Sequence, residues 1–294
     1  MSITASMVKE LRERTGAGMM ECKRALVEAD GNLDTAAELL RKSGQAKADK
    51  KAGRIAADGR VVIVVEGSKA VIVEINSETD FVAKDENFLA FTDSVAAAAL
   101  SYGDTDVAAF AKVKLDDGRT VEEARTELIA KVGEKISVRR IAAISSKGVL
   151  AGYTHGGRIA AVVALDGGDE MLARDIAMHV AATNPMCIDE SGVPAQALAT
   201  ERRILTEQAQ DSGKPPEIIE KMIAGRVNKY LKEITLLGQP FVKDPDVTVA
   251  KLLQAADASV ASFVRLEVGE GIEKKQENFA DEVMQQIEDA KKGS

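Results

Sequence analysis

The chain has no tryptophan, 3% aromatic residues, two cysteines and two histidines among its 294 residues. Cys22 and Cys187 lie far apart, and neither belongs to a CxxC motif or a Cys/His cluster, so nothing in the sequence indicates a structural metal site. No secretory signal is apparent, and no apolar run is long enough to span a bilayer. We therefore expect a cytoplasmic protein with reduced thiols and no membrane contact.

The chain also lacks an excess of positive charge. Its 47 acidic and 39 basic side chains give a net charge of −8. A general nucleic-acid binder needs a basic field, so we expect no direct contact with nucleic acid. An acidic surface suits a protein partner with a basic face, or solubility alone. With 45% apolar residues and no low-complexity tract, the chain is long enough to form several compact units.

Apolar residues at helical spacing in residues 1–43 predict a bundle of three short helices. Their predicted starts and ends are Thr4 and Gly16, then Met20 and Ala29, then Asn32 and Gly44. The basic run that follows, Lys42–Arg54, reads as a solvated linker, with a contact to an acidic partner as the alternative. Met19 and Met20 at a turn suit an adaptable partner contact, although either could instead fill the thin core of the bundle.

The middle of the chain contains a repeated pattern of two alternating strands, a corner and a helix. The first copy has strands 60–65 and 70–76 and a helix 86–100, and the second has strands 148–154 and 158–165 and a helix 170–182. Between them we expect a helix 120–133 and a strand 136–145. Two helices around a Gly-Pro turn in 193–237 predict an antiparallel helical hairpin. A strand 262–268 and a helix 277–291 complete a predicted α+β chain.

The stretch from Glu74 to Asp85 is the most informative part of the sequence. An alternating apolar segment, typical of a strand, ends there, and a helix with acidic residues at its start follows. Asp80 and Phe81 lie in the corner between the two. An apolar wedge beside a carboxylate suits insertion into a partner. The alternative is that Phe81 folds back as a lid on the core.

Four motifs give the chain a family resemblance. They are LRERTGAGMMECKRAL (11–26), EINSETDFVAK (74–84), YTHGGRIA (153–160) and GEGIEK (269–274). Together they resemble the elongation factor Ts family, in order and over essentially the whole chain. The resemblance implies an N-terminal three-helix, ubiquitin-associated-like bundle with its basic linker (1–54), a core of two related hairpin-plus-helix subdomains (55–146, and 147–192 with 238–268), an inserted helical hairpin (193–237) and a C-terminal helical module (269–294).

The resemblance also implies a function, which is guanine nucleotide exchange on elongation factor Tu during translation elongation. It assigns the disturbance of the partner's magnesium site to the turn Thr79, Asp80, Phe81 and Val82. Further partner contacts are expected in the bundle, its linker and the second subdomain, at Arg12, Met19, Met20, Lys23, Lys51 and His155. The partner would be bound in its GDP-bound and nucleotide-free forms. A homodimer or a dimer of heterodimers is compatible with the sequence.

We expect no cofactor, no catalytic residue and no enzymatic activity, because the sequence has no phosphate-binding loop, metal cluster or activated nucleophile. One competing interpretation is an enzyme that uses Asp80, His155 and His179 as acid, base and orienter. His179 lies in an apolar helix, as a buried structural histidine would, whereas His155 at a glycine-rich turn suits a partner contact. The other competing interpretation is a passive scaffold that binds several proteins without exchange activity.

Overall fold

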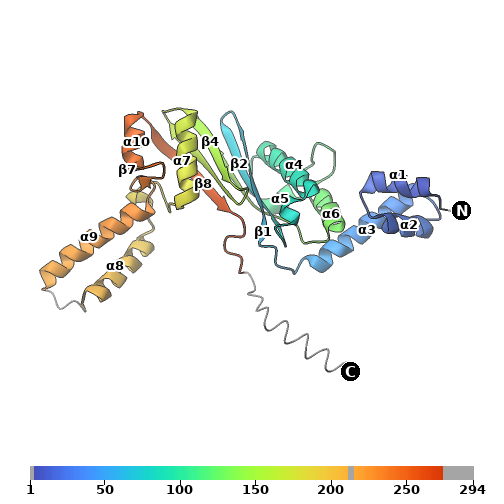
Figure 1. Cartoon of the computed structure of the whole chain (residues 1–294), viewed down its shortest axis with the longest axis horizontal. Coiled ribbons are helices and arrows are strands. Elements are labelled where there is room, and N and C mark those ends of the chain that lie inside the picture. The colour runs from blue at the N-terminus through green and yellow to red at the C-terminus, as the bar shows by residue number, and fades with distance from the viewer. Residues whose placement is uncertain (1–2, 211–214, 274–294) are drawn as a thin grey trace, which may run out of the picture.

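The computed structural model describes residues 3–210 and 215–273. The molecule is elongated, with a helical bundle at one end, two sheets in the middle and a helical hairpin at the other end (Figure 1). The sheets are antiparallel and are combined with helices in one chain, which makes the fold α+β. The predicted helix 277–291 lies outside the described residues.

The bundle consists of α1 (Ala5–Thr15), α2 (Met19–Glu28) and α3 (Leu33–Lys51). The predicted caps are present: the Thr4 hydroxyl accepts from the Met7 N–H at 3.3 Å, and the Asn32 side chain accepts from two N–H groups of the first turn of α3. The small core contains Leu11, Cys22, Ala25, Leu26, Ala29 and Ala36.

The predicted end of the third helix was wrong: α3 does not stop at Gly44 but continues to Lys51. The predicted solvated linker is therefore largely a helix. Gly44 faces the helix α6 (Val121–Val132), where an added Cβ would lie 3.7 Å from Thr126 and Ala130. Ala48 is buried in the core of the first sheet, which is described below. This tertiary packing outweighs the cost of about 1 kcal/mol for a glycine inside a helix.

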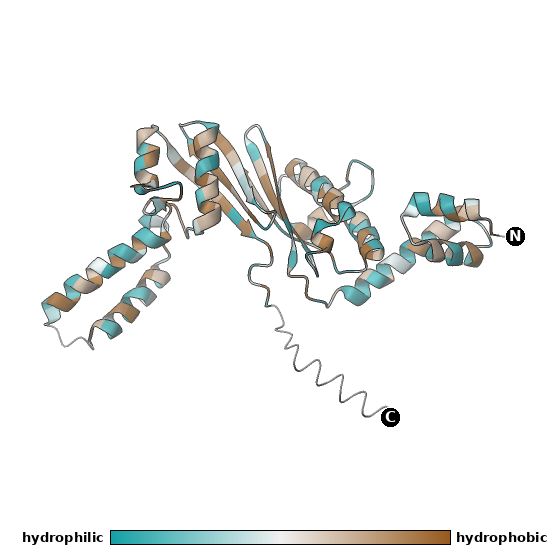
Figure 2. Ribbon diagram, viewed as in Figure 1, coloured by the Kyte–Doolittle hydropathy of each residue, from teal (hydrophilic) through white to brown (hydrophobic). Residues whose placement is uncertain are grey.

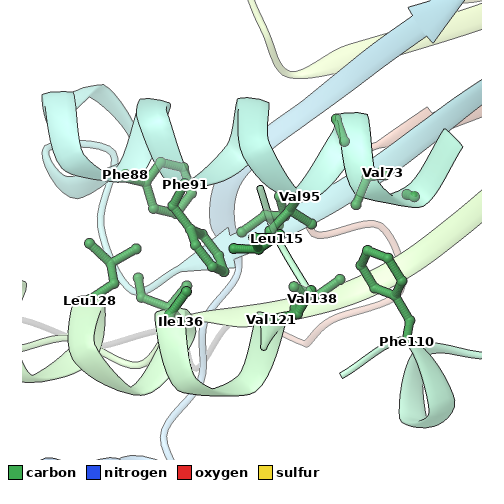
Figure 3. Packing of buried hydrophobic residues seen from close by; sticks show 14 of the residues in the cluster. Val73, Phe88, Phe91, Val95, Phe110, Leu115, Val121, Leu128, Ile136 and Val138 are labelled. Atoms are coloured by element: carbon green, nitrogen blue, oxygen red, sulfur yellow. The ribbon is translucent and has the colours of Figure 1, made fainter. Parts of the chain in front are cut away.

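The first sheet has the order β1 (Asp58–Glu66), β2 (Lys69–Ser77) and β3 (Ser137–Ser145), all antiparallel. The helices α4 (Glu86–Tyr102), α5 (Val107–Phe110) and α6 (Val121–Val132) pack against one face of it. Figure 3 shows aromatic and branched side chains of α4, α6 and the loops meeting those of the strands. The sequence analysis did not predict α5, which buries Phe110.

The second sheet has the order β4 (Val149–His155), β5 (Ile159–Asp166) and β8 (Ser259–Glu267), with α7 (Glu170–Thr183) on one face. Alternate residues of β2 and β5 face in opposite directions. Ile72 and Val162 meet in a core between the two sheets, while Val73 and Val163 face the helices. Figure 2 shows hydrophobic residues along both sheets, between the flanking helices. The sheets therefore form the two inner layers of a helix–sheet–sheet–helix sandwich.

A buried carboxylate fixes one sheet to the other. Glu74 on β2 accepts hydrogen bonds from Arg139 and Arg140 on β3 and from the N–H of Gly269, which follows β8. Burial alone would raise the pKa of Glu74, but the hydrogen bonds from Gly269 and Arg140 lower it overall. The sheets are thus joined by charge-assisted hydrogen bonds as well as by apolar packing.

The helical hairpin consists of α8 (Ala195–Gln210) and α9 (Pro216–Ile234), with Leu205, Val227 and Leu231 buried between them. The chain segments before and after the hairpin lie side by side, because the N–H of Leu236 donates to the carbonyl of Cys187 at 2.9 Å. Beyond it lie β6 (Pro240–Phe241), β7 (Asp244–Thr248) and α10 (Val249–Ala255), none of which the sequence analysis predicted. Within residues 3–210 and 215–273, no helix combines the length and the apolar content that crossing a membrane requires.

Candidate functional site at the turn between β2 and α4

The turn between β2 and α4 reverses the chain in the segment 78–85. It contains a short 3-10 helix, Val82–Lys84. The carboxylate of Asp85 then caps α4 by accepting from the N–H groups of Asn87 at 2.9 Å and Phe88 at 3.4 Å. The acidic start of α4 was predicted from the sequence, and it fixes one end of the turn.

Phe81 projects from this turn into solvent, with 81% of its surface exposed. It is the most exposed of the large apolar side chains that the structure describes. Its neighbour Val82 is partly buried against the core of the first sheet. The interpretation of Phe81 as a lid on the core is therefore wrong, because Val82 takes the inward position and Phe81 the outward one.

Asp80 lies beside Phe81 and forms an exposed ion pair with Lys84 at 2.7 Å. The hydrogen bond from Lys84, together with its charge, lowers the pKa of Asp80 below its usual value. At neutral pH the turn therefore presents a carboxylate next to an exposed aromatic ring.

Two carboxylates that the sequence analysis missed hold the other end of the turn. Glu134, in the loop between α6 and β3, accepts from the N–H groups of Glu78 and Thr79 at 3.1 and 3.0 Å and from the Thr79 hydroxyl at 2.7 Å. In return, Glu78 accepts from the N–H of Lys135 at 2.6 Å. No local pattern could have revealed this pairing, because the partners lie more than fifty residues apart in the sequence.

The bundle presents a second exposed apolar surface. Met19 and Met20 are 61% and 65% exposed, so the interpretation in which they fill the bundle core is wrong. Val27, which the sequence analysis did not single out, is also exposed, and Lys23 lies between it and Met19 at i+4 spacing. Arg12 on α1 is exposed as well. We refer to Met19, Met20, Lys23 and Val27 as the α2 face.

Lys51 is half-buried at the end of α3, and its amino group donates to the carbonyl of Gly133, the C-cap residue of α6. The position predicted as a partner contact thus has a contact within its own chain. It joins the bundle to the loop that carries Glu134.

His155 is exposed at the end of β4, where its Nδ1 lies 3.3 Å from the Tyr153 hydroxyl. His179 is completely buried, as predicted: its Nε2 lies 2.9 Å from the Gln239 side chain, and its Nδ1 accepts from the Val242 N–H at 3.2 Å. Burial lowers its pKa. Both ring nitrogens are occupied, which leaves none to orient a second catalytic group. The described residues contain no group of three or more metal-binding side chains.

Comparisons with known proteins agree on one family. The model of the family described as elongation factor TS matches residues 78–270. The elongation factor Ts of Thioalkalivibrio sulfidiphilus is 60% identical over 294 residues, which cover 99% of this chain and 100% of the relative. The chain belongs to the elongation factor Ts family. Similar relatives are the elongation factors Ts of Hydrogenovibrio crunogenus, 60% identical over 96% of this chain and 97% of the relative, and of Alcanivorax borkumensis, 60% identical over 94% and 98%.

The two kinds of comparison cover different parts of the chain. The family model begins at Glu78, so it includes the turn, and it leaves out the bundle. The similarity to the elongation factor Ts of Thioalkalivibrio sulfidiphilus, which extends over 99% of the chain, includes the bundle as well. Family membership therefore applies to both exposed apolar surfaces, the Phe81 turn and the α2 face.

Proposed function

We propose that this chain is the guanine nucleotide exchange factor for elongation factor Tu in translation elongation. It binds the GDP form, disturbs the magnesium site, and promotes GDP release before GTP binds. The observation that supports this most is the exposed Phe81, held beside the Asp80 carboxylate on a braced turn in a member of the elongation factor Ts family. The chain needs no covalent step and no cofactor for this role, so it is not an enzyme in the usual sense.

The proposed mechanism begins with Phe81. Bound GDP is held by backbone N–H groups around its phosphates and by a magnesium ion that bridges phosphate and protein ligands. Insertion of Phe81 between helices of the partner displaces the loops that carry the magnesium ligands. Complete burial of a phenylalanine side chain is worth about 1.5–3 kcal/mol, which is enough for a roughly tenfold to hundredfold change in nucleotide affinity.

Asp80 has a second role in this proposal. It enters the partner as a negative charge, since Lys84 keeps its pKa low. There it repels phosphate or competes for the donors that bind it. By linkage, nucleotide weakens the binding of this factor by the same coupling free energy, so incoming GTP expels the factor and completes the cycle.

The other expected contacts provide affinity in this proposal. The α2 face, Arg12 and Lys51 contact the nucleotide domain of the partner, as does the first core subdomain (55–146). His155 in the second subdomain (147–192 and 238–268) contacts another domain of the partner. The extension of α3 onto α6 supports a bundle that meets the partner in a fixed orientation, not on a flexible tether.

The experiment is the release of labelled GDP from purified elongation factor Tu, with and without this chain. An exchange factor accelerates release at substoichiometric concentration, because each molecule acts repeatedly. A passive scaffold, which is the alternative, binds the partner and leaves the rate of release unchanged.

A further inference from the structure

Phe81 has little packing of its own, so the backbone of the turn must set its position. With 81% of its surface exposed, the ring cannot be oriented by the core. Its chain neighbours are fixed, however. Val82 packs inward, and the N–H of Val82 lies 3.4 Å from the Thr79 hydroxyl. The position of Phe81 therefore depends on what holds Thr79 in place.

Thr79 is held by Glu134. One carboxylate oxygen of Glu134 accepts from the N–H groups of Glu78 and Thr79, and the other accepts from the Thr79 hydroxyl. Hydrogen bonds to a charged acceptor are roughly twice as strong as those between neutral groups. The Ser77 hydroxyl adds a bond to the Thr79 carbonyl at 2.9 Å. The N–H, the hydroxyl and the carbonyl of Thr79 are thus all engaged in hydrogen bonds.

The hydrogen bonds between the turn and the loop Gly133–Lys135 run in both directions, and they extend to the segment that follows α3. Glu78 accepts from the N–H of Lys135 and pairs with Arg54 at 3.3 Å, while the Lys135 amino group donates to the Arg54 carbonyl at 2.8 Å. The loop Gly133–Lys135 therefore contacts both the Phe81 turn and the segment that follows α3. The loop that braces the Phe81 turn therefore also contacts the C-terminal end of the bundle, where Lys51 donates to the Gly133 carbonyl.

We propose that Glu134 is a positioning residue for nucleotide exchange, which acts by holding the backbone of Glu78 and Thr79 so that Phe81 points out of the turn. This inference rests on the proposed function. Glu134 itself does not touch the nucleotide or the magnesium ion. Because Glu134 already fixes the turn in the free protein, little conformational entropy is lost when the turn binds. More of the free energy gained by burying Phe81 is then available to displace the loops of the partner.

The test compares Glu134→Ala and Glu134→Gln with the control Glu127→Ala. Glu127 is an exposed carboxylate on α6 that pairs with Arg119, away from the turn. At saturating factor we expect Glu134→Ala to lower the rate of GDP release about tenfold, which corresponds to about 1.4 kcal/mol. Glu134→Gln keeps one oxygen for the two N–H groups, so its loss is smaller. Glu127→Ala keeps the wild-type rate.

Two further readouts separate positioning from general stability. Amide hydrogen exchange of Glu78 and Thr79 accelerates in Glu134→Ala, while that of the α4 amides does not. In the Phe81→Ala background, adding Glu134→Ala has little further effect, because both changes remove the same action.

The inference is overturned if Glu134→Ala releases GDP at the wild-type rate although the two amides have lost protection. Rate losses that multiply in the double variant would overturn it as well. If Glu134→Ala melts far below the wild type, the rate and amide exchange of Glu134→Gln decide the question in the same way. A wild-type chain that does not accelerate GDP release at all contradicts the proposed function, whereas the amide exchange still tests the brace.

Discussion

The two sheets connect a strand to a helix in different ways. Between β5 and α7 the chain needs three residues, 167–169, and between β2 and α4 it uses eight, 78–85. Both helices are capped by an aspartate, Asp169 and Asp85. The short connection shows that the fold does not require the long one. The additional residues of the long connection carry Asp80 and the exposed Phe81, which supports the proposed contact of these two residues with a partner.

The short corner also shows what a purely structural connection looks like. Gly167 and Gly168 both have positive φ angles, and the corner packs tightly against residues 257 and 258. The long corner has no positive φ angle between residues 78 and 85 and is fixed by side chains from elsewhere, above all Glu134. The short corner is held by backbone packing, whereas the long corner is held by the Glu134 side chain, which a single substitution can remove.

The largest effect we expect in this comparison is on stability. Gly167→Ala places a Cβ 2.3 Å from the Asp257 carbonyl at a φ of +79°, so it should destabilise the fold by about 1–3 kcal/mol. The control Gly67→Ala, in the hairpin turn of the first sheet, has a φ of +56° and meets nothing within 4 Å, so the cost there is strain alone. Urea unfolding measures both, and equal losses would show that the short corner is not tightly packed.

The next effect is on exchange. Phe81→Ala should lower the rate of GDP release about tenfold, because the inserted ring contributes about 1.4 kcal/mol or more to the nucleotide-free complex. The melting temperature should not change, since the ring is exposed. The matched control is Met171→Ala, which removes a 74% exposed side chain next to the short corner.

An unchanged rate in Phe81→Ala, or an equal loss in Met171→Ala, would remove the functional distinction between the two corners. A melting temperature lowered by many degrees in Phe81→Ala would show that the ring stabilises the fold after all.

The smallest effect is a pH dependence confined to the second sheet. Burial lowers the pKa of His179, so the folded state binds its proton less readily than the unfolded state. The neutral ring contributes stability that is fully present above the unfolded pKa of about 6.5 and is lost as the pH falls toward the folded pKa. Glu74, which joins the sheets, contributes stability that is lost only at lower pH, because its pKa is lowered from a carboxylate value.

Two measurements follow. The protection factor of the Val242 amide, whose N–H donates to His179, should fall on acidification from pH 7 to 5 before the protection factors of β2 do, once each exchange rate is divided by its intrinsic rate at that pH. The ring signal of His179 in an NMR titration should shift only below the usual histidine range. A signal that titrates at or above pH 6.5 would contradict the assignment of His179 as a neutral buried residue.

Local patterns predicted most of this fold. The caps at Thr4 and Asn32 and the alternation of the strands depend on neighbours in the sequence, and the structure agrees with them. The end of α3 was missed because Gly44 is a typical helix-ending residue in a single sequence. Here the packing of Gly44 against α6 keeps the chain helical beyond it. The position of Phe81 at a corner was predicted, whereas the Glu134 brace was not, because long-range hydrogen bonds leave no periodic signal in a single sequence.

The most direct test of the central claim is GDP release from elongation factor Tu, measured with and without a magnesium chelator. If the Phe81 turn acts by disturbing the environment of magnesium, the chelator has already removed much of what the factor disrupts. We predict that the acceleration by this chain is much smaller in chelator than in magnesium, and that Phe81→Ala loses most of its defect there. Equal fold acceleration by the wild-type chain under both conditions would contradict the account.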